Sequence, residues 1–200
     1  MKNLTIYDGI DILGDPIVIK TVNNKEDFIK GLKVFQNPPY NEILTNKDCE
    51  EEYNLYNKNG IVFGAFIDDE IAGINCILND VPDTYGIGFY DNNKVAYYAG
   101  LAVLQEYRKR GIGKLLVQKT QKYLENYQNI DYTFARILCE GSMSEGIFKL
   151  NGFIDAKDNN NSLIVDEVTY ERNNSKTPIS DRRKYMVKVL NNKKIGWYRK

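Results

Sequence analysis

The sequence predicts an α/β fold with a mixed sheet in a single domain. Three observations support this prediction. Its 200 residues, 42% hydrophobic and 27% charged, have the size and composition of one globular domain. Along the chain, apolar residues switch between the two-residue period of strands and the longer period of helices. No linker rich in proline or glycine interrupts this order, and no segment repeats.

Runs of β-branched and aromatic residues predict the strands. In chain order they cover residues 16–22, 61–67, 71–78, 95–103, 132–139, 162–171 and 184–190. Asp68-Asp69-Glu70 joins the second run to the third and predicts a hairpin. Residues 79–94 form a long connection. Within 95–103, Gly100 predicts a bulge or a close approach of another group to the backbone.

Four segments have the apolar spacing of helices. They cover residues 25–36, 46–58 and 112–127, and the segment that follows Ser142. Asn24 predicts the N-cap of the first helix, and Thr45-x-x-Asp48 predicts a capping box for the second. Ser142-x-x-Glu145 predicts a capping box for the last. We expect residues 17–190 to form one domain, with residues 1–16 as an N-terminal extension and residues 191–200 as a basic tail.

Several functional classes are excluded by what the sequence lacks. It contains no histidine, which excludes Ser-His-Asp and Cys-His catalysis and every His-ligated metal site, so no metal is expected. Its three widely spaced cysteines form no CxxC pair and no disulfide scaffold. It has no apolar run of membrane-spanning length and no apolar signal segment at the N-terminus. These features predict a cytoplasmic protein with no membrane partner.

Charge is unevenly distributed, although the formal net charge is zero. Residues 66–93 carry carboxylates and no Lys or Arg: Asp68, Asp69, Glu70, Asp80, Asp83 and Asp91. Residues 105–122 are basic, with Arg108, Lys109, Arg110, Lys114, Lys119 and Lys122 against Glu106. Zero net charge and the absence of an interleaved aromatic and basic motif argue against a nucleic-acid partner.

A basic, glycine-containing turn follows the strand that ends at Val103 and leads directly into the helix that begins at Ile112. Such a strand–turn–helix unit is an anion site, because free N–H groups and the helix dipole both favour negative charge at a helix N-terminus. Gly111 and Gly113 leave space for phosphate oxygens to approach the backbone. The turn is not a Walker A loop, since Leu115 follows Gly113-Lys114, and the third glycine of a Rossmann motif is also missing.

The residues around this turn resemble a known family. The run Leu101-Ala102-Val103-x-x-Glu106-Tyr107-Arg108-x-Arg110-Gly111-Ile112-Gly113-x-Leu115-Leu116 is similar to the acetyl-CoA-binding motif of the GNAT superfamily of N-acetyltransferases. A second stretch, Ile147 to Phe153, resembles the family's segment that ends in Gly-Phe. The order of elements over residues 17–190 also fits. The resemblance implies a GNAT-like fold, with a mixed, mostly antiparallel sheet flanked by helices.

The resemblance also implies how acetyl-CoA binds. Backbone amides of Leu101 and Val103, in the stretch that also contains Ala102, would pair with pantetheine as a further strand would. The amides of the next turn would hold the pyrophosphate. That turn contributes Arg108, Lys109, Arg110, Gly111, Ile112, Gly113 and Lys114. Phe148 would contact the donor at a position where the family often has a tyrosine that protonates the CoA thiolate.

The general base is less clearly indicated. An amine must lose a proton before it attacks a thioester, and Glu140 and Tyr97 are the candidate catalytic residues. Asp80 and Asp83, on the adjoining loop, are further carboxylates that could act as the base. Each of the first two is also explained by a structural role, Glu140 as a solvated carboxylate and Tyr97 as a packing residue. Since Phe148 has no proton to give, another group acts as the acid, the thiolate leaves unaided, or the protein does not catalyse.

The sequence therefore predicts an acyltransferase that moves an acetyl group from acetyl-CoA to an amine by direct attack, through a tetrahedral intermediate. The alternative is an acyl-CoA-binding or regulatory module without turnover. The acidic stretch 66–93 favours a cationic acceptor, because its carboxylates would raise the local concentration of a cation. The sequence leaves open whether the protein forms a homodimer.

Overall fold

The computed structural model describes residues 4–36, 44–90, 94–127, 129–140, 142–170, 179–190 and 196–200. Asp91 of the acidic stretch and residues 191–195 of the expected tail lie outside this part. The described chain divides into a first unit, Met1–Leu78 with Ala99–Tyr123, and a second unit, Asn79–Tyr98 with Leu124–Lys200.

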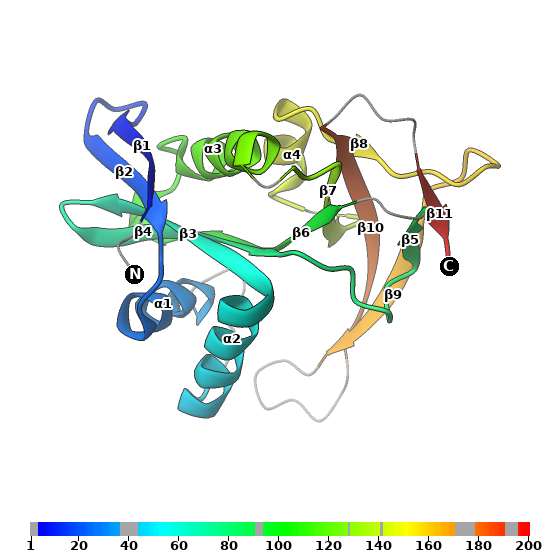
Figure 1. Ribbon diagram of the computed structural model, residues 1–200, viewed down its shortest axis with the longest axis horizontal. Helices are drawn as coiled ribbons and strands as arrows, with labels where there is room; N and C mark the ends of the chain where they lie inside the picture. The colour runs from blue at the N-terminus through cyan, green and yellow to red at the C-terminus, as the bar shows by residue number, and fades with distance from the viewer. Residues whose placement is uncertain are drawn as a thin grey trace. The chain divides into compact units, whose positions relative to one another are not determined.

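The elements are labelled as in Figure 1. The helices are α1 (Lys25–Leu32), α2 (Asn46–Asn59), α3 (Ile112–Tyr127) and α4 (Glu145–Leu150), with short 3-10 segments η1 (Lys33–Gln36) and η2 (Gln105–Tyr107). The strands are β1 (Thr5–Ile10), β2 (Pro16–Thr21), β3 (Gly60–Ile67), β4 (Glu70–Leu78), β5 (Ile87–Phe89), β6 (Val95–Val103), β7 (Tyr132–Leu138), β8 (Ile154–Asp155), β9 (Val165–Tyr170), β10 (Ile179–Val189) and β11 (Trp197–Arg199). Among the described residues, β6 pairs with β7 in parallel, whereas the pairs β1–β2, β2–β3, β3–β4, β7–β10, β8–β10, β9–β10 and β5–β11 are antiparallel, which confirms the mixed, mostly antiparallel sheet.

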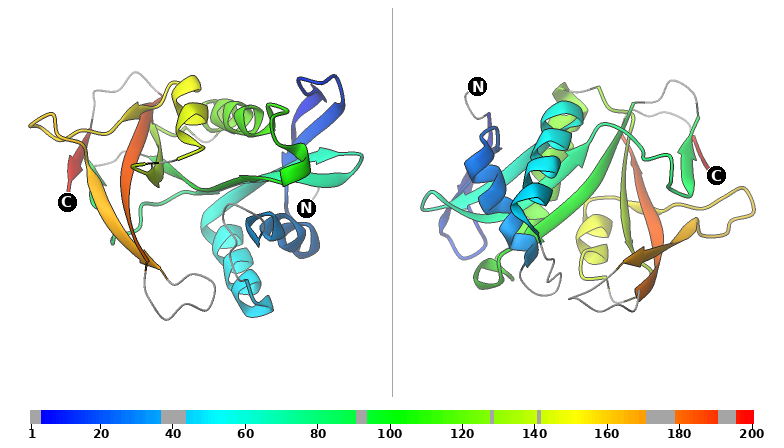
Figure 2. Two further views of the ribbon diagram at one scale, coloured as in Figure 1. Left: turned by 180° about the vertical axis from the view of Figure 1, so that it is seen from behind. Right: turned by 90° about the horizontal axis from the view of Figure 1, so that it is seen from below.

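In the first unit, β1, β2, β3 and β4 pair in chain order, and helices cover both faces (Figure 2). Alternate residues of a strand point to opposite faces, and β3 shows this clearly. Val62 and Phe66 pack in the core under α1 and α2, whereas Phe63 and Ala65 pack with Ile112 of α3. The turn between β3 and β4 confirms the predicted hairpin.

The end of β6 belongs to the first unit and lies beside β4. The backbone N–H of Leu104 donates to the carbonyl of Ala72 at 2.9 Å. A Cβ built on Gly100 would lie 2.8 Å from Cζ of Phe35, which confirms a close approach to this glycine. These contacts fix the strand that leads into the basic turn.

In the second unit, the first half of β6 pairs with β7, β7 pairs with β10, and β10 pairs with β8 and β9. Aromatic rings fill its interior: Tyr97 stacks on Phe134, with ring centroids 4.7 Å apart and planes at 17°. A separate pair joins β5 to β11.

Most predicted elements are present; the differences are shifted ends and four strands that were not predicted, β1, β5, β8 and β11. Residues 5–10, expected in the N-terminal extension, form β1, and β10 begins earlier than predicted, at Ile179. The predicted capping box Ser142-x-x-Glu145 is wrong. The N-cap of α4 is Ser144, without a side-chain cap, so Glu145 is the first helical residue and not the third, as a capping box needs. Its carboxylate pairs with Lys149 and Lys184.

Candidate functional site

The basic turn of the first unit joins the end of β6 to the start of α3. Ala102 packs in the core, whereas Leu101 and Val103 are half-buried. After η2 the backbone takes an unusual path: Lys109 has φ +61° and Gly111 has φ +76°, so two left-handed residues flank Arg110. A lysine rarely adopts this conformation, so surrounding contacts must stabilise the turn.

Gly111 is confined on its side-chain face as well as in its backbone. A Cβ built there would lie 2.9 Å from Cγ2 of Ile12, in the loop between β1 and β2. Glycine avoids both this contact and the strain of a left-handed φ. We expected Gly111 to leave space for phosphate oxygens, but the side on which a Cβ would lie is occupied by Ile12.

The start of α3 provides backbone donors. The first helical hydrogen bond runs from Leu115 N–H to the Gly111 carbonyl, at 3.0 Å. The preceding N–H groups, of Ile112, Gly113 and Lys114, have no acceptor within the helix, as at any helix start. Because α3 has 16 residues, its dipole adds a partial positive charge at this end. The arrangement suits a compact anion such as a diphosphate.

The basic side chains of the turn have different environments. Lys109 and Lys114 are exposed to solvent. Arg108 donates from Nε to the carbonyl of Val103 at 3.0 Å, so it braces the strand end. Arg110 donates from Nε to Asp11 at 2.5 Å and also pairs with Asp15.

The pair of Asp11 and Arg110 is enclosed. The Asp11 side chain is 0% exposed and that of Arg110 is 14% exposed. Burial disfavours the charged carboxylate, but hydrogen bonds from Arg110, Leu13 N–H and Asp15 N–H outweigh it, so the pKa of Asp11 lies below its usual value. The hydrogen bond from Arg110 to Asp11 raises the pKa of Arg110. Sequence reasoning missed Asp11, since nothing in the pattern links residue 11 to residue 110.

The two candidate catalytic residues belong to the second unit. Tyr97 is 7% exposed, and its hydroxyl lies 3.1 Å from that of Tyr85, to which it is hydrogen-bonded. Burial, followed by the neighbouring Tyr85, raises the pKa of Tyr97 far above its usual value. A phenol that stays protonated is a poor proton acceptor, which argues against Tyr97 as the base. Glu140 follows β7 and is exposed.

Phe148 also belongs to the second unit, on α4. Its ring is 3% exposed and meets the rings of Tyr98 and Phe153 edge to face, with centroids 5.5 and 5.0 Å away. Phe148 therefore packs in a cluster of aromatic rings of the second unit.

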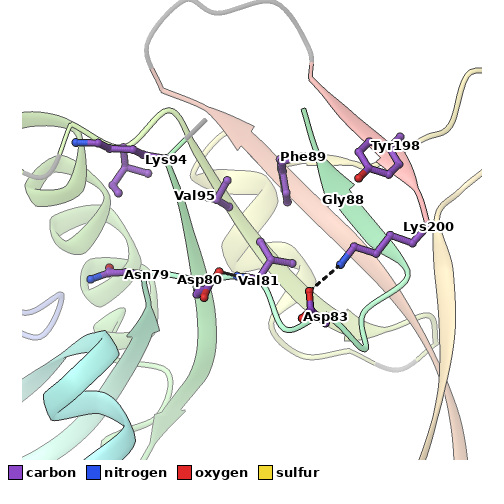
Figure 3. A pocket seen from close by; sticks show the side chains of 11 residues that line it. Asn79, Asp80, Val81, Asp83, Gly88, Phe89, Lys94, Val95, Tyr198 and Lys200 are labelled. Carbon is purple, nitrogen blue, oxygen red and sulfur yellow. Dashed lines mark hydrogen bonds and ion pairs between the residues drawn. The ribbon is translucent and has the colours of Figure 1, made fainter. Parts of the chain in front are cut away.

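The acidic stretch is divided between the two units. Asp68 and Asp69 form the exposed hairpin turn of the first unit. Asp80 and Asp83 line a cavity of about 670 Å³ in the second unit, together with Lys94 and Lys200 (Figure 3). Lys200 Nζ lies 3.9 Å from Asp83. Both signs of charge therefore face this cavity, which weakens the argument for a purely cationic ligand there.

Comparison with known proteins places the chain in a family. The family model described as "Acetyltransferase (GNAT) family" matches residues 28–153, which include the whole basic turn. The chain belongs to the GNAT acetyltransferase family. The GNAT match ends at Phe153, the residue that closes the second motif.

A curated relative of this GNAT chain is named as an N-alpha-acetyltransferase. N-alpha-acetyltransferase 60 of Xenopus tropicalis is 30% identical over 87 residues, which cover 44% of this chain and 35% of that protein. The match thus spans about a third of the relative's length.

Solved structures share the fold. Arabidopsis thaliana NAA60 with a bisubstrate analogue has a TM-score of 0.64 at 15% identity, over 88% of this chain and 99% of that one. The ribosomal-protein-S18-alanine N-acetyltransferase of Escherichia coli also has a TM-score of 0.64, at 12% identity over 90% of this chain and 99% of that one.

Among the residues that the structure describes, no cluster of three His, Cys, Asp or Glu side chains has the arrangement of a metal site. In the same part of the chain, no helix combines the length and apolar character needed to span a bilayer.

Proposed function

We propose that this protein transfers an acetyl group from acetyl-CoA to a primary amine. The observation that carries the proposal is the left-handed Gly111 at the start of α3, followed by helix N–H groups that point away from the helix. Within a family of acetyltransferases, such a turn suits the pyrophosphate of CoA. Lys109 and Lys114 are exposed cations of the same turn and would add charge attraction.

The end of β6 would hold the rest of the donor. In this proposal the backbone amides of Leu101 and Val103 pair with pantetheine, as the resemblance to the family implies. An amide near Val103 polarises the thioester carbonyl, which stabilises the oxyanion that forms on attack. The amine lone pair bonds to the carbonyl carbon, the C–S bond then breaks, and the sulfur leaves as thiolate.

The environments of three side chains support our proposal for proton transfer. Phe148 has no proton to donate, and a thiol with a pKa near 8.5 is a tolerable leaving group without an acid. Tyr97 is held protonated by its burial. Glu140, exposed at the end of β7, is therefore our candidate for the general base that takes the amine proton.

The acceptor is proposed as a class. The names of the relatives refer to N-alpha-acetylation and to an alanine of a ribosomal protein, so the α-amino group of a peptide is included in the test panel. A polyamine and a lysine side chain represent cationic acceptors, and a neutral amine serves as the comparison. If Asp80 and Asp83 attract a cationic acceptor, replacing both by Asn will lower kcat/KM for that acceptor. The replacement will also remove the dependence of this kcat/KM on salt concentration.

The decisive experiment follows free thiol while the protein is incubated with acetyl-CoA and this amine panel. Amine-dependent thiol release, with acetylated product seen by mass spectrometry, supports the proposal. Calorimetry on the same protein measures acetyl-CoA binding. Binding without release would favour an acyl-CoA-binding module, for which Phe148 is the specific argument. Absence of binding would contradict both functions.

A further inference from the structure

Asp11 lies in the loop between β1 and β2, outside residues 28–153 that match the family model. Hydrogen bonds from its own loop hold its carboxylate in place. Oδ1 accepts hydrogen bonds from the N–H groups of Leu13 at 2.8 Å and Asp15 at 3.1 Å. The other oxygen accepts from Arg110 Nε at 2.5 Å. A carboxylate with this many donors has a fixed orientation, so the group that it holds is fixed as well.

The main chain of this loop also reaches the turn. Ile12 N–H donates to the Arg110 carbonyl at 3.5 Å, and the Ile12 side chain lies on the side of Gly111 where a Cβ would be. The ring of Tyr107 lies 5.5 Å from the Arg110 guanidinium carbon. Arg110 is thus held through both its side chain and its carbonyl, between two residues whose left-handed backbone is unfavourable by itself.

We propose that Asp11 is a positioning residue of the acetyl-CoA site: it anchors Arg110 and so fixes Gly111 and the first N–H groups of α3 to receive the pyrophosphate. The inference rests on the proposed function. Arg110 then acts as an anchor of the turn and not as a phosphate ligand, since its charge is neutralised by Asp11 and Asp15. The phosphates would meet backbone N–H groups and the exposed Lys109 and Lys114.

A double-mutant cycle distinguishes whether Arg110 anchors the turn or binds phosphate. Asp11→Asn, Arg110→Gln and the double variant are compared in the full chain for the Kd of acetyl-CoA by calorimetry, and for KM and kcat. If Arg110 is an anchor, each single variant raises Kd and KM about 10-fold, below the ~100-fold that an ångström of misplacement can cost. The double variant then raises Kd and KM no further, because each single variant already removes the pair of Asp11 and Arg110. The kcat at saturating acetyl-CoA stays unchanged.

The opposite outcome has a clear signature. If Arg110 binds phosphate directly, Asp11→Asn frees the guanidinium and tightens binding, whereas Arg110→Gln weakens it. That result would overturn the inference. Asp8→Asn removes the same charge from an exposed position of β1 and serves as the matched control, with unchanged Kd. Asp15→Asn removes the partner that is 55% exposed and leaves Asp11 in place, so we expect a smaller effect.

Folding is checked by circular dichroism and thermal unfolding of each variant. If Asp11→Asn does not fold, Arg110→Lys keeps the positive charge but loses the fork that joins two carboxylates, and we expect an intermediate Kd. Unchanged Kd in folded Arg110→Lys and Arg110→Gln overturns the inference alone. A native protein that binds no acetyl-CoA overturns the proposed function, and the inference with it.

Discussion

The ring of Phe148 on α4 meets the ring of Tyr98 on β6 edge to face, with centroids 5.5 Å apart and planes at 81°. Phe153 contacts Phe148 in the same way, so three rings form one apolar cluster of the second unit. The position where the family often has a proton-donating tyrosine is, in this protein, part of a packed core.

Phe148→Tyr is therefore expected to destabilise the protein. The added hydroxyl enters an apolar cluster, and burial of a hydroxyl without a partner costs about 1–3 kcal/mol. Chemical denaturation measures the change in free energy of unfolding, and thiol release measures turnover. Phe89→Tyr makes the same change on a half-buried ring and should have little effect. Normal stability with faster turnover in Phe148→Tyr would show that the new phenol donates a proton.

Gly111→Ala is expected to weaken acetyl-CoA binding by about 1–3 kcal/mol, the usual cost of an overpacked contact. The new Cβ would press on Ile12, and a left-handed φ is strained for alanine. The double variant Gly111→Ala with Ile12→Ala relieves the contact but not the strain, so it should recover part of the affinity. Gly146→Ala is the control, because no atom lies within 4 Å of the Cβ built there. An unchanged affinity of folded Gly111→Ala for acetyl-CoA would show that the turn is not part of the acetyl-CoA site.

Glu140→Gln and Tyr97→Phe distinguish the two candidate bases. Loss of a general base lowers kcat by about 10²–10⁴-fold, and we expect this for Glu140→Gln. Tyr97→Phe should retain kcat, because the Tyr97 hydroxyl stays protonated in the folded protein. A pH profile of kcat/KM supports the assignment if its acidic limb disappears in Glu140→Gln. The reverse pattern of activities would make Tyr97 catalytic.

The lowered pKa of Glu145 makes the free energy of unfolding depend on pH. Hydrogen bonds from Lys149, then Lys184, lower the pKa of Glu145 below its ordinary value of 4.5. The folded state therefore binds fewer protons than the unfolded state, so this contribution is present above pH 4.5 and is lost as pH falls through the folded pKa. Between about pH 3 and 5, denaturation midpoints of Glu145→Gln should vary less with pH than those of the native protein. Glu106→Gln, on an exposed carboxylate, should follow the native curve.

Local signals predicted much of the fold. The capping box at Thr45 and Asp48 forms as predicted, because both partners lie within one turn of α2. The hairpin at Asp68-Asp69 also forms, with both residues left-handed. Three-residue strands such as β11 escaped prediction, since so short a run has no detectable period and its pairing with β5 joins residues far apart in the chain.

For the site, the sequence predicts backbone chemistry only. The spacing of Gly111 and Gly113 before a long helix indicates an anion site, which stays a prediction, and the left-handed φ of Gly111 is a finding of the structure. The partners of the charged side chains were not predictable, because Arg110 could equally have faced a phosphate. Its carboxylate partner lies 99 positions earlier in the sequence, and only the folded hairpin of β1 and β2 brings the two together.

The anchored turn also bears on the speed of ligand capture. Contacts within the chain hold this turn, because Asp11 accepts a hydrogen bond from Arg110, which lies between the left-handed Lys109 and Gly111. A site that needs no ordering avoids the entropy loss of induced fit, and its association rate is not limited by a conformational step. In stopped-flow mixing with acetyl-CoA, a single exponential phase should appear, with an observed rate that rises linearly with ligand concentration and reaches no plateau.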